Sequence, residues 1–147
     1  MASTAASGSR SGKSAADSEL SLFRLYVVRA LYFLIAFAEG SQVIPALFAH
    51  EPTARGVLPS LLSGFCLLCL FGLKYPRQML PLLMFEFAWK NIWFFAFGLP
   101  QYLSGQVPPT FAEDFKAITA GVVIMPFVLP WGYLWRHYVR ASGDRWR

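Results

Sequence analysis

The sequence predicts an all-α membrane protein, a bundle of four transmembrane helices with both termini in the cytoplasm. Of its 147 residues, 56% are hydrophobic and only 14% are charged, whereas a soluble domain carries about 25% charged residues. The apolar residues gather in four segments, each close to the 20 or so residues that a helix needs to cross the hydrocarbon core. The basic residues lie at the ends of these segments and form no stripe, which favours lipid headgroups and argues against nucleic acid as a partner.

The chain divides into one membrane domain and two tails. Residues 1–18 are rich in Ala, Ser and Gly and have almost nothing to bury, so we expect a disordered cytoplasmic tail. Residues 19–140 form the predicted transmembrane domain, and residues 141–147 form a short basic cytoplasmic tail.

The first apolar segment, residues 22–48, carries two arginines near its start and one glutamate, Glu39, near its end. Arginine side chains near a helix end can extend to the membrane surface, but a glutamate this far along the helix cannot easily do so. Glu39 is therefore expected inside the membrane. The alternative is an early end of the helix at Gly40 or Pro45, which would place Glu39 near the outer headgroups.

The second and fourth helices are predicted over residues 56–73 and 117–135, which are free of charge. The fourth contains Pro126 and Pro130, one turn apart. Each proline removes a backbone hydrogen bond and frees the carbonyl four residues earlier, so we expect a helix kink at these two prolines. Freed carbonyls at membrane depth need a partner.

The third helix is predicted over residues 79–102, although Glu86 and Lys90 interrupt its apolar run. A helix over the charge-free residues 91–112 is a poorer choice, because that stretch is rich in proline and would leave the apolar run before Glu86 outside the membrane. Pro81 falls in the first turn of the preferred helix, where its missing N–H is tolerated.

The distribution of Lys and Arg predicts the orientation. Ten of the thirteen lie on the side of the termini, two lie on the opposite side, and Lys90 lies within the membrane. Short loops rich in Lys and Arg stay in the cytoplasm, so both termini and the loop after the second helix are placed there. The ten are Arg10, Lys13, Arg24, Arg29, Lys74, Arg77, Arg136, Arg140, Arg145 and Arg147; the two are Arg55 and Lys116.

A polar cluster inside the membrane is the main candidate site. Glu86 and Lys90 are four residues apart, on one helix face and in the favourable order for an ion pair. Each charge alone would cost roughly 2.5–3.5 kcal/mol at the centre of a membrane helix. Counted from the cytoplasmic arginines at 1.5 Å per residue, Glu39 and Lys90 lie at similar depths of roughly 20 Å. The predicted cluster consists of Glu39, Gln42, Glu86, Lys90 and Asn91.

Other motifs are given a structural interpretation. Cys66 and Cys69 match C-x-x-C, but they lie within an apolar run, have no second cysteine pair, and are expected to act as small hydrophobic residues. We expect no metal and no cofactor. Pairs of small residues four apart, at Ala36/Gly40, Ser60/Gly64 and Ala117/Gly121, are consistent with close helix contacts.

The layout resembles that of small bacterial DoxX-like membrane proteins over residues 22–140. The resemblance rests on four short helices, very short loops, a glutamate late in the first helix, and the ending Pro-Trp-Gly-Tyr-Leu-Trp-Arg-His-Tyr at residues 130–138. It implies a bacterial inner membrane, and some members of that family are linked to oxidoreductase partners or redox stress.

Three hypotheses on function follow. The first is a non-catalytic protein, either an accessory subunit of a membrane protein partner or a binder of a small apolar, lipid-like molecule in the bundle. The second is a proton-coupled carrier or pore, as a homo-oligomer, that uses Glu39, Glu86 and Lys90. The third is a membrane enzyme that acts on a lipid-like substrate with a glutamate as general acid/base.

Overall fold

The computed structural model describes residues 20–49, 56–105, 108 and 110–141, and within them all regular structure is helical. The expected cytoplasmic tails, residues 1–18 and 141–147, lie outside the described residues except for Ala141.

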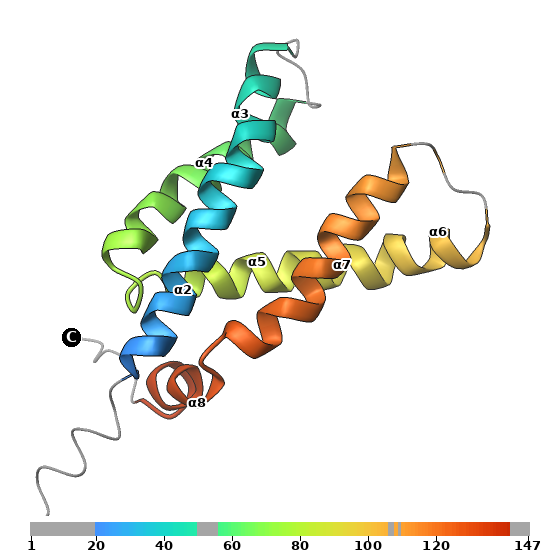
Figure 1. Ribbon diagram of the computed structural model, residues 1–147. Coiled ribbons are helices and arrows are strands. Elements are labelled where there is room, and N and C mark those ends of the chain that lie inside the picture. The colour runs from blue at the N-terminus through green and yellow to red at the C-terminus, as the bar shows by residue number, and fades with distance from the viewer. Residues whose placement is uncertain (1–19, 50–55, 106–107, 109, 142–147) are drawn as a thin grey trace, which may run out of the picture.

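The first two membrane segments form an antiparallel hairpin (Figure 1). The first helix is continuous and passes through one π-helical turn, so Gly40 and Pro45 do not end it. The Ser21 hydroxyl caps its start by accepting a hydrogen bond from the Arg24 N–H at 3.3 Å. The elements of this hairpin are α2 (Leu22–Leu34), the π-helix η1 (Ile35–Glu39), α3 (Gly40–Ala49) and α4 (Val57–Lys74).

The next two segments form a second hairpin. Its first helix again contains a π-helical turn, and Pro81 lies at the helix start, where it removes no intrahelical hydrogen bond. The long helix ends at Leu103, one residue past the predicted boundary. The elements are α5 (Leu80–Trp93), the π-helix η3 (Phe94–Gly98), α6 (Leu99–Leu103) and α7 (Phe111–Val128).

The fourth segment differs from the single helix expected over residues 117–135. It begins at Phe111, and Glu113 and Asp114 occupy its first turn, where the helix dipole favours acidic side chains. It stops at Val128, because Pro130 disfavours a helical conformation at the residue before it, and Leu129 is extended (φ −63°, ψ 130°). Two short elements follow, α8 (Trp131–Leu134) and the π-helix η4 (Trp135–Val139), and together they are bent by 69° from α7.

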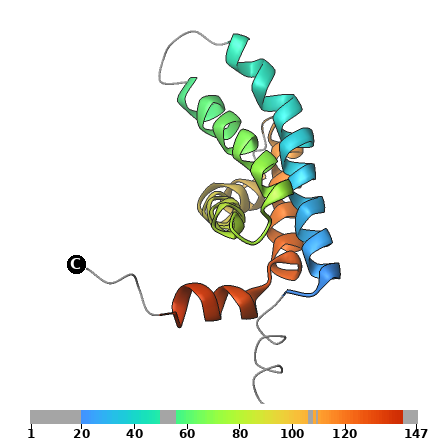
Figure 2. The same cartoon turned by 90° about the vertical axis from the view of Figure 1, so that its left-hand side faces the viewer.

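The two hairpins meet at one end and diverge at the other (Figure 1). In Figure 2, α5 is viewed along its axis while α2, α3 and α4 are seen from the side, so α5 runs across the first hairpin. We call the end with the α4–α5 turn and α8 the closed end, and the other the open end. The buried core lies at the closed end and takes side chains from every long helix, among them Val28, Tyr32, Cys69, Leu80, Leu83 and Met125.

The described residues contain three helices long and apolar enough to cross a membrane, or four if the bent pair of α7 and α8–η4 counts as one span. Between 17% and 28% of the most apolar window in each of the three is buried within the chain. Large apolar side chains such as Phe48 and Phe127 are more than 80% exposed. A soluble protein would not leave this much apolar surface in water, so the chain has the helices of a membrane protein.

Two close contacts hold α2 against α4 at the closed end. The Tyr32 ring, fully buried, lies directly over the backbone of α4 at Gly72, where an added Cβ would clash with the ring. The Arg29 Nε donates a hydrogen bond of 3.1 Å to the Leu73 carbonyl in the last turn of α4, a position where the helix dipole favours a cation. Arg29 thus joins α2 to the C-terminal end of α4.

We predict that Gly72→Ala destabilises the protein by about 1–3 kcal/mol, because the methyl group forces the buried Tyr32 ring away from α4. Gly64→Ala is the matched control in the same helix, because a Cβ at Gly64 meets nothing within 4 Å. Melting in detergent should show a lower Tm for Gly72→Ala and no loss for Gly64→Ala, since alanine is the better helix former. Equal effects of the two changes would contradict the Tyr32 contact.

Candidate functional site

Three charged side chains meet where the two hairpins begin to diverge. The Lys90 Nζ lies 2.8 Å from Glu86 Oε1 on its own helix and 4.0 Å from Glu39 Oε2 on the first hairpin. The exposed fraction of the side chain rises from 1% for Glu86 to 13% for Lys90 and 21% for Glu39. We call Glu39, Glu86 and Lys90 the charged cluster. Glu86 is its buried centre, and Glu39 is its more accessible member.

Trp89 is a second partner of Glu86, and this contact was not predicted from the sequence. Its indole Nε1 donates a hydrogen bond to Glu86 Oε2, the oxygen that Lys90 does not contact. The Lys90 Nζ also lies 5.2 Å from the centre of the Trp89 ring, close enough for a cation–π interaction. Residues three apart lie on one face of a helix, so the spacing of Glu86 and Trp89 could have predicted this contact. Both carboxylate oxygens of Glu86 therefore have a partner within one turn of α5.

Gly121 of α7 makes room for the lysine. A Cβ at this position would lie 2.7 Å from Lys90 Cδ, so the aliphatic stem of Lys90 packs directly on the α7 backbone. Gly121 belongs to the Ala117/Gly121 pair in which the sequence indicated a close helix contact. Gly40 is likewise buried, and a Cβ there would lie 3.5 Å from Cys66 Cβ. Gly64, by contrast, faces open space.

Gln42 and Asn91 do not join the three charged residues. The exposed Gln42 donates its amide to the Ala38 carbonyl at 3.2 Å, and the half-buried Asn91 donates its amide to the Phe87 carbonyl at 2.7 Å. Each amide thus binds a carbonyl of its own helix, one turn earlier. Depth along the helix was insufficient to place them in the cluster, because the rotation of each residue about the helix axis also matters.

The break in the fourth segment lies at Leu129 and Pro130, while Pro126 remains within α7. The Pro126 carbonyl, one of the two expected to be freed, accepts a hydrogen bond of 2.7 Å from the Trp131 indole Nε1. Tryptophan directly after the break therefore satisfies a carbonyl that a straight helix would have left unpaired. This pairing ties α8 to the end of α7.

Cys66 and Cys69 are both buried and carry free thiols. The Cys66 Sγ lies 3.8 Å from the Ile35 carbonyl in η1, a weak contact between α4 and the first helix. Within the part of the chain that the structure describes, no group of three or more His, Cys, Asp or Glu side chains could hold a metal ion. The two cysteines occupy positions in the core.

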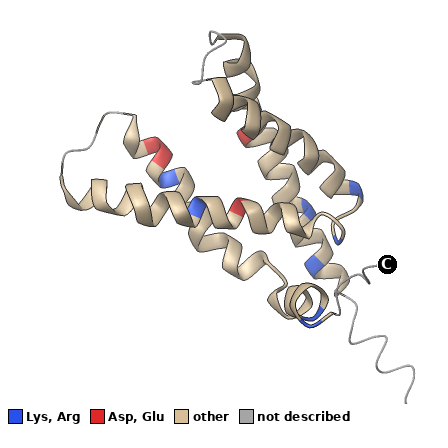
Figure 3. Cartoon of the chain, turned by 180° about the vertical axis from the view of Figure 1, so that it is seen from behind, with Lys and Arg blue, Asp and Glu red and all other residues tan. Residues whose placement is uncertain are grey.

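The charged cluster has a defined place in the fold. Figure 3 shows that most charged positions lie near the helix ends, whereas α5 carries an acidic and a basic position in its middle. Glu39 is the last residue of η1, and Lys90 lies one turn before η3. π-helical turns are rare and occur frequently at functional sites. Both long helices therefore change their winding next to the residues that link the hairpins.

Two pockets open on the apolar helices, and the smaller one borders the buried core at Ala36 and Cys66. The larger, of about 400 Å³, lies between α5–α6 and the start of α7. The smaller, of about 340 Å³, lies between the first helix and α4. The larger is lined by Trp93, Ala96, Phe97, Pro100, Gln101, Ser104, Pro108 and Phe111. The smaller is lined by Ala36, Phe37, Gly40, Ser41, Ile44, Pro45, Cys66, Leu67 and Leu70.

Comparisons of this chain with protein-family models, with curated proteins and with solved structures find no match.

We predict that Lys90→Met destabilises the protein by about 3–5 kcal/mol, because it leaves the buried Glu86 carboxylate without its cation. The double change Glu86→Gln with Lys90→Met should recover most of this loss. Glu39→Gln should rescue Lys90→Met less well, because Glu39 lies farther from Lys90 and is more exposed. Melting temperature in detergent and membrane yield are the measurements.

Lys116→Met is the matched control for this series, since Lys116 is an exposed lysine of α7. It should leave both readouts unchanged. A Lys90→Met protein as stable as the control would show that the charged cluster is hydrated, and the proposed burial would then be wrong.

Proposed function

We propose that the protein is a non-catalytic, multi-pass protein of a bacterial inner membrane that binds a small lipid-like molecule beside its helices. The observation that carries this proposal is the pair of apolar pockets, about 400 and 340 Å³, on helices of membrane-spanning character. Pockets of this size, lined mainly by apolar and aromatic side chains with few polar groups, are typical of small-molecule sites.

The contacts of the charged cluster support a binding function rather than catalysis. Glu86 pairs with Lys90 through one oxygen and with Trp89 through the other, and its side chain is 1% exposed, so this acid is buried away from a substrate. The ion pair of Glu86 and Lys90 stabilises the interior of the protein. The apolar surfaces of the diverging hairpins are the parts of the chain that remain available for a ligand.

The same proposal includes four membrane spans with both termini in the cytoplasm. The closed end carries Arg24, Arg29, Lys74 and Arg77. The bent α8–η4 segment adds Arg136 and four aromatic residues, Trp131, Tyr133, Trp135 and Tyr138. Basic and aromatic side chains together are typical of a membrane surface. The closed end would then face the cytoplasm and the open end the other side. The inner membrane is inferred from the resemblance to DoxX-like proteins.

Reporter fusions test this topology. Fusions after Lys74 and after Arg147 should both report the cytoplasm, and a fusion near Gln106 should report the opposite side. The expectation follows from the ten-to-two distribution of Lys and Arg. An external reporter at the C-terminus, with the Lys74 fusion in the cytoplasm, would require an odd number of spans after Lys74 and would contradict the proposed topology.

Native mass spectrometry of the purified protein tests the binding function. We expect a lipid-like molecule to remain on the protein after extraction in mild detergent, because the pockets adjoin the hydrocarbon phase. A membrane protein extracted in parallel reports detergent and bulk lipid carry-over. A stoichiometric protein partner with no retained lipid would favour an accessory subunit instead.

A proton-coupled carrier is the second candidate, and the geometry of Glu39 favours it. The charged cluster has two carboxylates for one ammonium. Glu39 lies farther from Lys90 than Glu86 does, and it is the more exposed of the two acids. An excess negative charge at membrane depth is costly unless a proton or another cation is taken up. Glu39 is therefore the group through which a proton would enter.

Proteoliposomes loaded with a pH-sensitive dye test this candidate. If the protein carries protons, Glu39→Gln should abolish the dye response to an imposed pH gradient, while Glu113→Gln should not, since Glu113 is an exposed acid at the start of α7. No response above empty liposomes for the unmodified protein would remove this candidate and leave the binding function untouched.

A further inference from the structure

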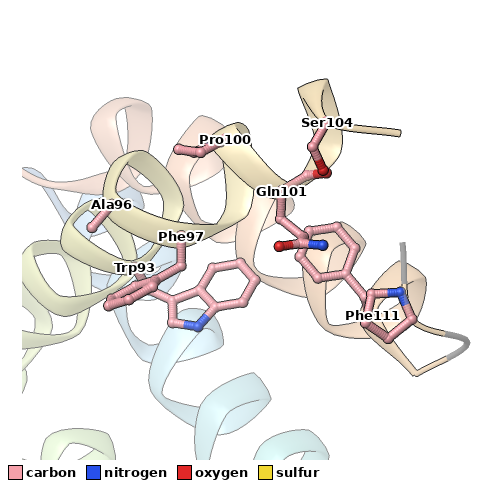
Figure 4. A pocket seen from close by; sticks show the side chains of 8 residues that line it. Trp93, Ala96, Phe97, Pro100, Gln101, Ser104 and Phe111 are labelled. Atoms are coloured by element: carbon pink, nitrogen blue, oxygen red, sulfur yellow. The ribbon is translucent and has the colours of Figure 1, made fainter. Parts of the chain in front are cut away.

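The side chains that line the larger pocket indicate which class of ligand it can bind. Its wall on α5, η3 and α6 carries Trp93, Phe97 and Gln101, and Phe111 of α7 faces them (Figure 4). Figure 4 shows the Gln101 side chain extending toward the space between Trp93 and Phe111. The pocket lies at the open end, near the end of the long helix, and so at the depth where a lipid head meets its chains.

The aromatic wall is held in place by contacts within the second hairpin. The Trp93 and Phe111 ring centres are 6.0 Å apart at an interplanar angle of 30°. Gly98 leaves space for the indole, because a Cβ there would lie 2.7 Å from the Trp93 ring. The rings are therefore positioned before any ligand arrives, which lowers the cost of binding.

These side chains favour a flat, conjugated ring. Aromatic pairs gain about 0.5–1.5 kcal/mol beyond the burial of their area, and three aromatic side chains line this one pocket. Gln101 and Ser104 are the two polar residues among the eight that line the pocket, and the Ser104 hydroxyl donates a hydrogen bond of 2.7 Å to the Gln101 carbonyl. The smaller pocket differs, since it is lined mainly by aliphatic residues, with Ser41, Cys66 and a single phenyl ring, and suits a hydrocarbon chain.

The charges around the larger pocket argue against an anionic head. None of its eight lining residues is charged. Glu113 and Asp114, both exposed, follow Phe111 in the first turn of α7, and Lys116 balances only one of them. An anionic headgroup would have to lose its water beside this acidic turn, whereas a neutral head would not.

We propose that the pocket of Trp93, Phe97, Gln101 and Phe111 binds the neutral aromatic head of a lipid-like molecule, with the ring against Trp93 and Phe97. Its chain would leave along Ala96 and Pro100 into the membrane. This inference rests on the proposed binding of a lipid-like molecule and adds the site and the chemical class of the ligand.

A titration in lipid nanodiscs tests the site. The probe is decyl para-hydroxybenzoate in mildly acidic buffer, which keeps the phenol neutral, and the comparison compound is decyl para-hydroxycyclohexanecarboxylate, which has the same chain and a saturated ring. We expect the aromatic probe to bind about tenfold more tightly, the ratio that corresponds to the stacking energy of such rings. It should also change the tryptophan fluorescence, and Trp93→Phe should remove that change while retaining a ring.

Phe97→Ala and Phe95→Ala form a matched pair, because the two side chains are 63% and 62% exposed in the same π-helical turn and only Phe97 lines the pocket. Phe97→Ala should weaken binding of the aromatic probe about tenfold, and Phe95→Ala should not. The high exposure of both side chains leaves the fold intact, which equal melting temperatures would verify.

Equal affinities for the two compounds, or equal effects of the two substitutions, would overturn the inference. Retained native lipids in the same preparation would then still support the general binding function. An aromatic lipid recovered from the purified protein and lost in Phe97→Ala, but kept in Phe95→Ala, would support both.

Discussion

The placement of Lys90 between two carboxylates is the constraint on which the rest of the structure depends. An isolated ammonium within an apolar helix is costly at membrane depth, so the lysine needs acids close by and a route for its aliphatic stem. Glu86 supplies the near acid and Glu39 the one across the hairpins, while Gly121 lets the stem lie on the α7 backbone. One side chain thus connects the first helix, α5 and α7. The π-helical turns η1 and η3 both lie next to the charged cluster, where the first helix and α5 meet.

The same cluster marks the boundary between the two ends of the molecule. On one side of it, side chains from all the long helices form the buried core, and Arg29 and the Tyr32–Gly72 contact fasten the first hairpin. On the other side, the aromatic contacts lie within the second hairpin, as in the stacks of Phe115 with Phe94, Tyr102 and Phe111. The larger pocket occurs where one hairpin no longer covers the other. A closed bundle over the full length of the helices would have left less room for a ligand.

The sequence predicted what depends on composition and on depth, and missed what depends on rotation about a helix axis and on local backbone chemistry. Apolar runs predicted helices of membrane-spanning character, and residue counting placed Glu39 near the depth of Lys90. Counting could not show that Gln42 and Asn91 turn to carbonyls of their own helices. The fourth helix was limited to charge-free residues, so its start at Phe111 was not predicted. The two prolines were treated alike, but only Pro130 restricts Leu129, the residue at which α7 ends. The larger pocket was beyond sequence reasoning, because Phe111 was assigned to a loop and meets Trp93 only through the packing of the hairpins.

The two candidate functions make different demands on Glu39, since neither pocket is lined by a residue of the charged cluster. Glu86, Lys90 and Trp89 satisfy one another within a single turn of α5, so this group stays neutral as a whole if Glu39 gains a proton. Protonation of Glu39 would remove its attraction to Lys90 and weaken a link between the first hairpin and α5, without exposing an unpaired charge in the core. The hairpins could then separate further at the open end, while the core at the closed end stays packed. Each pocket is lined by residues of a single hairpin, so a looser link between the hairpins would leave the walls of both pockets in place.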